Sequence, residues 1–283
     1  MMITKKKRNW IITLVILLAL VVWIIWGNIT VETHRVTISS SDIPSDFVGY
    51  KIAQISDFHN TEIGANNSKL MAILRNEQPD MIAFTGDLVD SRKTDVGTAL
   101  AFVKEALKVA PCYYVTGNHE ARLGNIYANL EMKMKEYGVT ILRDESIDIT
   151  KGDVSIQLIG LDDPDFIEGD SAYGETMVNE KLLAIEQHPG YKILLSHRPE
   201  FFKTYVANGM NLVLCGHTHG GQFRIPFIGG IVAPNQGFLP KYDAGLFIEG
   251  STQMIVSRGV GNSIVPVRFN CRPEIVIVEL DTL

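Results

Sequence analysis

Short apolar runs alternate with helix-forming stretches along the chain from residue 50 onward. The apolar runs have the length of strands and are rich in β-branched and aromatic residues. They predict strands at residues 50–56, 81–86, 112–117, 154–161, 192–196, 211–216, 253–257 and 274–280. The stretches between them predict helices over residues 68–78, 94–110, 125–137 and 199–208, of which the last begins at a proline and the last two are followed by glycine.

The order of these elements predicts an α/β fold. Early alternation of strand and helix is typical of a largely parallel sheet covered by helices. From Gly216 onward the chain is rich in Gly and Pro and carries few helix signals, so we expect the later strands to be antiparallel or mixed. The polar, β-prone residues 27–45 predict a connector that can enter an edge strand.

An unbroken apolar run occupies residues 10–26, where Thr13 is the one polar residue. As a helix this run spans ~25 Å at ~1.5 Å per residue, near the lower limit for crossing a bilayer core. Tryptophans at both ends suit the membrane interfaces, and the basic residues 5–8 predict a cytoplasmic N-terminus. We therefore expect a single-pass membrane protein with a basic cytoplasmic flank (1–9), a transmembrane anchor (10–26), a connector (27–48) and an extracytoplasmic catalytic domain (49–283).

The apolar run has two other interpretations. A buried core helix is disfavoured because the run has no polar face. A cleaved signal peptide has the required basic start, but residues 26–29 (Trp-Gly-Asn-Ile) form a poor cleavage context. Secretion after cleavage is therefore the alternative to anchoring in the cell membrane.

Charge is distributed unevenly along the chain. Residues 1–26 hold four of the 26 basic residues and none of the acidic ones, so residues 27–283 carry 22 basic against 32 acidic residues, or −10 of net charge within a chain total of −6. Such an acidic body fits a nucleic-acid backbone poorly, and we expect no nucleic-acid partner. The three cysteines predict no disulfide framework, and Cys112 and Cys215 lie in apolar runs typical of buried side chains.

Residues that bind metals follow five of the apolar runs, in the segments Asp57-Phe58-His59, Gly86-Asp87-Leu88-Val89-Asp90, Gly117-Asn118-His119-Glu120, Ser196-His197 and Gly216-His217-Thr218-His219. Five of the seven histidines lie at these positions, whereas His34 and His188 do not. In open α/β sheets the carboxyl ends of the strands border the ligand-binding crevice, so we expect these loops to converge.

The donor types predict a site for two divalent metal ions. Carboxylate, amide and imidazole donors without cysteine suit Mn²⁺, Fe²⁺, Zn²⁺ or similar ions. A carboxylate that bridges two ions allows them to hold a hydroxide for in-line attack on phosphorus. The glycines before Asp87, Asn118 and His217 are expected to permit a sharp exit from each strand. Taken alone, most of these segments are more typical of a turn, a surface loop or a satisfied histidine at a strand end, and the His217-Thr218-His219 segment fits a loop and a metal site about equally. The prediction therefore depends on their joint occurrence.

The five segments together resemble the calcineurin-like metallophosphoesterase family over roughly residues 50–260. The stretch Gly-His-Thr-His-Gly-Gly-Gln (216–222), the late Arg-Gly-Val-Gly-Asn-Ser (258–263) and the apolar N-terminus further resemble its membrane-associated bacterial phosphodiesterase branch. That branch includes peptidoglycan-associated enzymes and pyrophosphatases acting on UDP-diacylglucosamine. The resemblance implies a four-layer α-β-β-α sandwich with the metals at the strand ends.

The resemblance also implies roles for individual residues. Asp57, His59 and His219 would hold the first metal, and Asn118, His197 and His217 the second, with Asp87 bridging them. His119 would be the catalytic histidine, which contacts the phosphate and protonates the leaving oxygen. Asp90 would orient and charge His119, although the same carboxylate suits a turn before Ser91 and Arg92.

The resulting hypothesis is hydrolysis of a phosphoester by metal-bridging hydroxide, with His119 as general acid. Arg198 is a candidate for binding substrate phosphate or a plain surface charge, and Arg224, Lys241, Arg258 and Arg268 are weaker candidates. A membrane-tethered phosphodiesterase would meet lipid head groups or cell-envelope polymers, unless the anchor serves retention alone. A UDP-diacylglucosamine-type pyrophosphatase, a phosphoprotein phosphatase and a non-catalytic metal-binding scaffold of the same fold are the alternatives. The sequence carries no signal for an oligomeric state.

Overall fold

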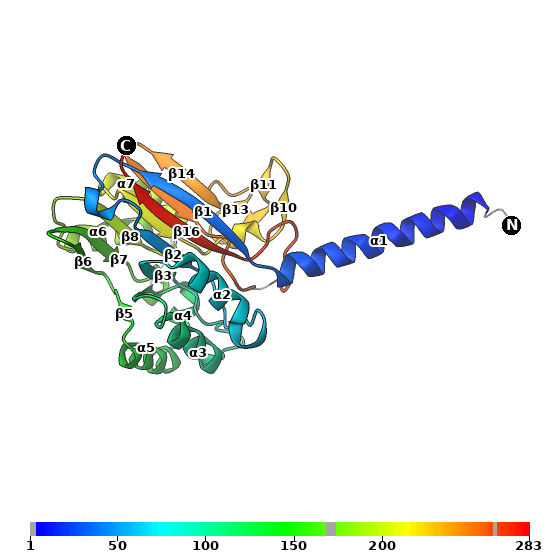
Figure 1. Ribbon diagram of the computed structural model, residues 1–283, viewed down its shortest axis with the longest axis horizontal. Coiled ribbons are helices and arrows are strands. Elements are labelled where there is room, and N and C mark those ends of the chain that lie inside the picture. Colours follow the sequence, from blue (N-terminus) through cyan, green and yellow to red (C-terminus); the bar gives the residue numbers. More distant parts are fainter. Residues whose placement is uncertain (1–3, 168–173, 263–264) are drawn as a thin grey trace.

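Two six-stranded sheets form the centre of the molecule, and helices lie on their outer faces (Figure 1). This architecture is seen in a computed structural model that describes residues 4–167, 174–262 and 265–283. Ser263, the last residue of the late motif quoted above, lies outside the described residues. The arrangement is the expected α/β fold with two mixed sheets.

The first sheet contains the early strands together with the last one. Its order is β1 (Glu32–Ser39), β16 (Glu274–Asp281), β2 (Lys51–Ile55), β3 (Met81–Thr85), β4 (Cys112–Val115) and β5 (Thr140–Ile141). The strands from β2 to β5 are parallel, β16 is antiparallel to β2, and β1 is parallel to β16. The polar connector therefore does enter an edge strand, β1.

The second sheet contains the middle and late strands. Its order is β14 (Gly245–Glu249), β15 (Thr252–Val256), β9 (Leu212–Cys215), β8 (Lys192–Leu195), β7 (Val154–Gly160) and β6 (Glu145–Lys151). The four inner strands are parallel and both edge strands are antiparallel. The expectation of mixed pairing after Gly216 is confirmed, because β15 is parallel to β9 and antiparallel to β14.

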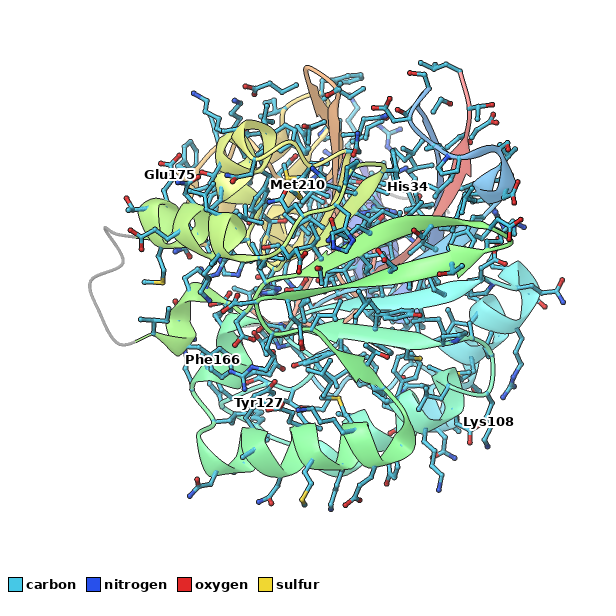
Figure 2. All side chains as sticks on the ribbon, turned by 90° about the vertical axis from the view of Figure 1, so that its left-hand side faces the viewer. His34, Lys108, Tyr127, Phe166, Glu175 and Met210 are labelled. Atoms are coloured by element: carbon cyan, nitrogen blue, oxygen red, sulfur yellow. The ribbon has the colours of Figure 1, made fainter. Side chains whose placement is uncertain are left out.

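Three hydrophobic layers hold the sheets and helices together. The middle layer joins the two sheets, with Ile52 and Val115 from one sheet packed near Leu158 and Ile193 from the other. One outer layer lies under α2 (Ser68–Glu77), α3 (Val96–Ala106) and α5 (Asn125–Tyr137), and the other under α6 (Gly174–Ala184) and α7 (Phe202–Ala207). Figure 2 shows side chains filling these layers, among them Tyr127, whose ring centroid is 5.2 Å from that of Phe166. Helix, sheet, sheet and helix thus form the four layers.

The predicted helices are present with shifts at their ends. The helix expected over residues 94–110 starts at Val96, after Asp95 accepts a hydrogen bond from the Thr98 N–H at 3.0 Å, and ends at Ala106. The helix expected over residues 199–208 starts with a 3₁₀ turn, Pro199–Phe201, before α7.

Several elements carried no clear signal in the sequence. These are α4 (Asn118–Ala121), α6, the edge strands β5, β6 and β14, and the short hairpin strands β10 (Arg224–Ile225), β11 (Gly229–Gly230), β12 (Val232–Ala233) and β13 (Gly237–Phe238). The β10–β11 and β12–β13 pairs are antiparallel hairpins, as the Gly- and Pro-rich composition indicated. All of these elements except α6, β6 and β14 are four residues or shorter, too short for a periodic pattern.

The N-terminal helix α1 (Lys5–Ile29) projects from the domain (Figure 1). None of its residues is buried, and its apolar window is long enough and hydropathic enough to cross a membrane. Its last turn touches the body, because the Asn28 side chain donates to the Arg268 carbonyl at 2.9 Å and accepts from the Arg268 N–H at 2.8 Å. The helix is therefore a candidate membrane span joined to the domain at one end.

Candidate metal centre

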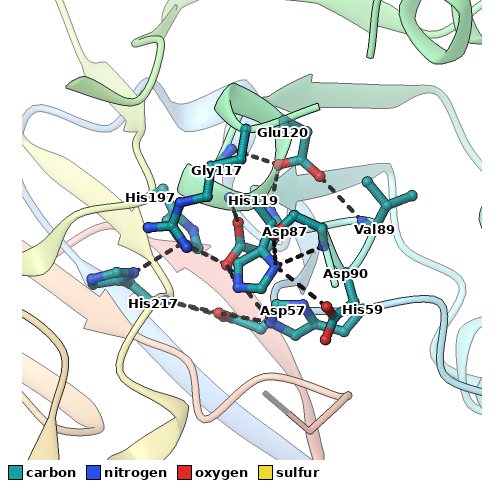
Figure 3. Close-up of polar contacts among 12 residues, drawn as sticks. Asp57, His59, Asp87, Val89, Asp90, Gly117, His119, Glu120, His197 and His217 are labelled. Atoms are coloured by element: carbon teal, nitrogen blue, oxygen red, sulfur yellow. Dashed lines mark hydrogen bonds and ion pairs between the residues drawn. The ribbon is translucent and has the colours of Figure 1, made fainter. Parts of the chain in front are cut away.

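Residues that follow the carboxyl ends of five strands from both sheets lie together, and Figure 3 shows the polar contacts among most of them. From the first sheet, β2 leads to Asp57 and His59, β3 to Asp87 and Asp90, and β4 to Asn118 and His119. From the second sheet, β8 leads to His197, and β9 to His217 and His219. All of these side chains are buried. The structure thus brings together every residue that the sequence placed in the metal and catalytic sets.

One cluster of donors consists of Asp57, His59 and His219. The Nε2 atoms of His59 and His219 are 3.2 Å apart, and His219 Nε2 is 3.3 Å from Asp57 Oδ1. Their ligand atoms all lie within 4.8 Å of one another, a spacing compatible with one shared ion.

A second cluster consists of Asp87, His197 and His217. His217 Nδ1 is 3.2 Å from His197 Nε2, which is 3.2 Å from Asp87 Oδ2. Asp87 Oδ2 also lies 3.7 Å from His59 Nε2 of the first cluster. This carboxylate is therefore positioned between the two clusters, as a bridging ligand must be.

The donor set fits two divalent cations. In each cluster, two buried imidazole nitrogens face one another at hydrogen-bond distance, an arrangement that a cation bound to both lone pairs explains well. The Asn118 Oδ1 atom is buried and has no hydrogen-bond partner within the described part of the chain. A buried oxygen without a partner is costly unless it serves as a ligand.

Burial sets the protonation of most of these groups. It lowers the pKa of His59 to about 4 and holds the pKa values of His217 and His219 well below the usual range. These imidazoles are therefore neutral at pH 7, the form that binds metals. For His197, burial also acts to lower the pKa, but the Asp87 carboxylate outweighs it and raises that pKa to about 10.

The backbone at the site is strained at the ligands themselves. Asp57, His59, Asp87, His217 and His219 all have positive φ, between 47° and 71°. The left-handed region costs a non-glycine residue on the order of 1 kcal/mol or more and is concentrated at functional sites. The ligand side chains converge because their own backbones turn out of the strands.

The expectation about the neighbouring glycines is partly wrong. Gly86 has a positive φ of 88°, but Gly117 and Gly216 do not. These two are required for close packing instead: a Cβ on Gly117 would lie 2.3 Å from Asp87 Oδ1, and one on Gly216 would lie 1.7 Å from Ser56 Oγ. Glycine at these positions lets the loops approach each other.

His119 is held by Ser91 more closely than by Asp90. Its Nδ1 accepts a hydrogen bond from the Ser91 N–H at 2.9 Å, and Ser91 Oγ is 3.1 Å away. Asp90 Oδ1 is 3.8 Å from the same nitrogen, and the Asp90 carboxylate binds the backbone and guanidinium of Arg92. Asp90 thus forms the turn with Arg92 that was the alternative interpretation from the sequence, and it also lies near His119. Ser91 was not among the predicted site residues, because a hydroxyl beside a turn has no distinctive pattern.

Glu120 is a second residue whose role was missed. It is fully buried, and its carboxylate accepts hydrogen bonds from the N–H groups of Asp87 (2.9 Å), Val89 (3.1 Å) and Gly117 (2.8 Å) (Figure 3). Burial, and then the charge of Asp87, raise its pKa to about 8. Glu120 ties the β3 and β4 loops together. The sequence signal that could have identified Glu120 is its position directly after two predicted site residues, at the end of the Gly-Asn-His-Glu segment.

Arg198 has partners other than the expected phosphate. The side chain is buried, and its guanidinium donates to both oxygens of Asp163, at 2.5 and 2.8 Å. Asp165 and Glu200 lie 2.9 and 3.6 Å from it. Its Nη1 is 3.2 Å from His217 Nε2. The edge that would bind a phosphate in bidentate fashion is occupied by Asp163, so Arg198 supports His217 rather than forming a free anion site.

The weaker basic candidates are also engaged. Arg224 pairs with Asp243 at 2.8 Å, Arg258 donates to Glu274 at 2.7 Å, and Lys241 lies over the Tyr242 ring. Arg268 is fully buried, donates to the Arg258 carbonyl at 2.7 Å and approaches His219 Nδ1 at 3.4 Å. Of these side chains, Arg268 is therefore the one in contact with the proposed ligand set.

Comparisons with known proteins agree with this geometry. The family model "Calcineurin-like phosphoesterase" matches residues 50–221. The chain is 33% identical to the metallophosphoesterase YkuE of Bacillus subtilis (strain 168) over 88% of this chain and 85% of that protein. It is 29% identical to the phosphodiesterase YaeI of Escherichia coli (strain K12) over 82% of each chain. A Bos taurus "Transmembrane protein with metallophosphoesterase domain" is 30% identical over 88% of this chain and 55% of that protein.

Proposed function

Because the chain belongs to the calcineurin-like phosphoesterase family, whose members are phosphoric ester hydrolases, we propose that it is a membrane-anchored phosphodiesterase that uses two divalent metal ions. The observation that carries the proposal is the placement of Asp87 between two His/Asp clusters, with His119 beside it. The similarity to YaeI, whose name is phosphodiesterase, supports a diester over a monoester.

Seven residues hold the two ions in this proposal. Asp57, His59 and His219 bind the first ion, and Asn118, His197 and His217 bind the second. Asp87 contributes to both. When bound, the ions activate water as a nucleophile and neutralise charge on the phosphoryl oxygens. Mn²⁺, Fe²⁺ and Zn²⁺ all suit these donors.

His119 protonates the leaving oxygen in this proposal. Its Nε2 faces the site, 4.0 Å from Asp87 Oδ2, while Nδ1 faces Ser91. Burial lowers the pKa of His119, and the carboxylates of Asp87 and Asp90 act against that shift. In this geometry the Ser91 N–H donates to Nδ1, which leaves the ring proton on Nε2, the atom that faces the site. From that position the residue can give a proton to the leaving oxygen.

The helix α1 anchors the enzyme in the membrane in this proposal, with the N-terminus cytoplasmic and the catalytic domain outside. The four basic residues before the apolar run support this orientation. A C-terminal fusion tests it: alkaline phosphatase, active only outside the cytoplasm, should be active, whereas an active cytoplasmic reporter at the same position would reverse the topology. A shortened chain in the culture medium would indicate signal cleavage instead.

Substrate profiling of the purified full chain tests the proposed activity. The chain is stripped with chelator, reloaded with Mn²⁺, Fe²⁺ or Zn²⁺ and assayed on aryl phosphodiesters, aryl phosphomonoesters and nucleotide-sugar pyrophosphates. We expect the diesters to be hydrolysed with the highest kcat/KM. Preferred cleavage of the pyrophosphates would replace the diesterase proposal by the pyrophosphatase alternative, and inactivity with both ions bound would indicate a scaffold.

A further inference from the structure

An apolar surface lies beside the candidate metal centre, on the side of the domain from which α1 projects. It consists of the β10–β13 hairpins (residues 222–242) and the loop segment 265–270, and we call it the hairpin face. Its large apolar side chains are exposed to between 37% and 108%: Phe223, Ile225, Phe227, Ile228, Val232, Phe238, Leu239, Val265 and Val267. A soluble surface seldom gathers so many large apolar side chains, and such patches mark interaction sites.

The hairpin face itself contains no acidic residue, although residues 27–283 as a whole carry −10. Within it, Arg224 pairs with Asp243 and Arg268 is buried, so Lys241 is its exposed basic residue. Exposed aromatic and aliphatic side chains without a carboxylate among them suit a lipid interface.

The hairpin face is continuous with the end of the candidate membrane span. The Trp23 ring of α1 packs edge-on against Phe269 at 5.1 Å, and Phe269 stacks with Phe223 at 6.4 Å. Arg272 lies 4.6 Å above the Trp26 ring. In Figure 1, β10 and β11 lie on the side of the domain from which α1 projects. The aromatic contacts therefore place the face at the depth of the tryptophans at the C-terminal end of the span, where a membrane interface is expected.

The same hairpins contact the metal centre. Asn235, at the turn between β12 and β13, lies with its Oδ1 3.1 Å from His217 Nε2. Arg224 donates to the Gly220 carbonyl at 2.9 Å, next to His219. Anything that positions the hairpins therefore also positions the entrance of the site.

We propose that the hairpin face is a membrane-docking surface that lies in the lipid interface beside α1 and holds the metal centre against the bilayer. The substrate class that follows is an amphiphilic phosphoester whose phosphate lies at the membrane surface. The proposal rests on the anchoring by α1 proposed above. A second copy of the chain or another protein fits less well, because the face lies beside a span that itself requires lipid.

Spin-label depth measurements on the full chain in lipid nanodiscs test the docking. Nitroxide labels are attached to Phe227→Cys and Phe238→Cys, and the matched control is Leu183→Cys on α6, a side chain that is 69% exposed away from this face. The native cysteines are buried, so the unsubstituted chain reports background labelling. We expect the labels at 227 and 238 to be accessible to oxygen and protected from a water-soluble nickel chelate, and the label at 183 to show the opposite.

Two results would overturn the docking proposal. Equal exposure to the nickel chelate at all three positions would mean that the face lies in water. Protection of 227 and 238 from both reagents would mean that protein covers the face.

An activity comparison tests the substrate class. For the double variant Phe227→Ser/Phe238→Ser, we expect unchanged hydrolysis of a soluble bis-aryl phosphodiester and about tenfold slower hydrolysis of a long-chain alkyl aryl phosphodiester embedded in the nanodisc. Equal rates for variant and unsubstituted chain on the embedded substrate would refute the amphiphile assignment. If the unsubstituted chain hydrolyses neither substrate, the proposed function fails, while the label depths still decide the docking.

Discussion

The metal centre and the ion pairs around it are both buried, but their polar groups are arranged in opposite ways. Arg198 saturates Asp163 and Arg258 saturates Glu274, each through two or more hydrogen bonds. In the metal centre, imidazole nitrogens face each other, and Asn118 Oδ1 lacks a partner among the described residues. The backbones differ as well, since Asp163 and Arg198 have φ of −59° and −100° whereas Asp57 and Asp87 lie near +50°.

This difference distinguishes buried charges that are paired within the fold from buried groups that can bind a ligand. A saturated pair in relaxed backbone needs no further partner, and removing one of its members leaves a buried charge uncompensated. Metal-binding side chains, most of them in strained backbone and here called the open cluster (Asp57, His59, Asp87, Asn118, His197, His217 and His219), cost stability and remain available to a ligand. The saturated pairs therefore support the backbone that holds the open cluster in place. Substitutions in the metal centre should accordingly change metal content or activity, whereas substitutions in the saturated pairs should lower the free energy of unfolding.

Asp87→Ala should have the largest effect in the open cluster. Loss of the carboxylate between both ions should reduce bound metal to less than one ion per chain and lower kcat/KM by about 10³-fold or more. Elemental analysis and phosphodiester assays measure this. The control is Asp144→Ala, because Asp144 also has a positive φ (56°) but lies outside the centre. Two ions retained by Asp87→Ala would contradict the bridging role.

His119→Ala should act on chemistry and leave metal content unchanged. We expect kcat to fall by about 10²-fold or more on a diester with an alkyl leaving group, since that oxygen must be protonated. The loss should be much smaller for a p-nitrophenyl leaving group, which departs as a stable anion. Equal losses with both leaving groups would argue against proton donation by His119.

Arg198→Met should act on stability. Removing one partner of this buried pair leaves Asp163 uncompensated and should lower the free energy of unfolding by about 4 kcal/mol. Denaturant titration of the metal-free chain in detergent measures it. Asp163→Asn should lower the free energy of unfolding by less in the Arg198→Met background than in the unsubstituted chain. A raised KM with unchanged stability would instead restore the phosphate-binding role expected from the sequence.

Glu274→Gln should have a smaller effect that depends on pH. Burial opposes ionisation of Glu274, but hydrogen bonds from His34 and Arg258 lower its pKa to about 2. Because the folded pKa lies below the unfolded one, the carboxylate contributes about 3 kcal/mol above pH 5, and this is lost as the pH falls toward 2. The stability gap between the unsubstituted chain and Glu274→Gln should therefore close over that range. Glu249→Gln, at an exposed end of β14, should show no such gap.

Much of the fold was predictable because its signals are local. Strand length, β-branched composition and helix stops predicted eight strands and four helices, and all twelve are present in the structure. Among the elements that were missed, β5 and β10 are two residues long, and the longer β6 and β14 are edge strands; all four owe their conformation to the strands they pair with. α6 was missed although it is eleven residues long, and its weakly amphipathic sequence carries little periodic signal.

The sequence predicted the metal-binding residues of the candidate site, but not the hydrogen bonds that hold them in place. The donors Asp57, Asp87 and His217 were identified by residue type and strand-end position. The contacts of Glu120 with three loop N–H groups, of Ser91 with His119, and of Arg198 with Asp163 were not. A hydrogen bond between residues far apart in the chain leaves no local pattern, so sequence reasoning assigned Arg198 to substrate and overlooked Glu120.

The sequence by itself determined which side chains of metal-binding type lie at the strand ends, because side-chain type and position at a strand end are properties of a few consecutive residues. The tertiary structure alone decided which of them lie together, since His59 and His219 are 160 positions apart and meet only when the two sheets stack. It also decided that the ligands themselves take the strained backbone and that the apolar hairpins lie beside Trp23. These outcomes depend on packing between distant segments, where the free energy of burial is shared by elements that no local pattern connects.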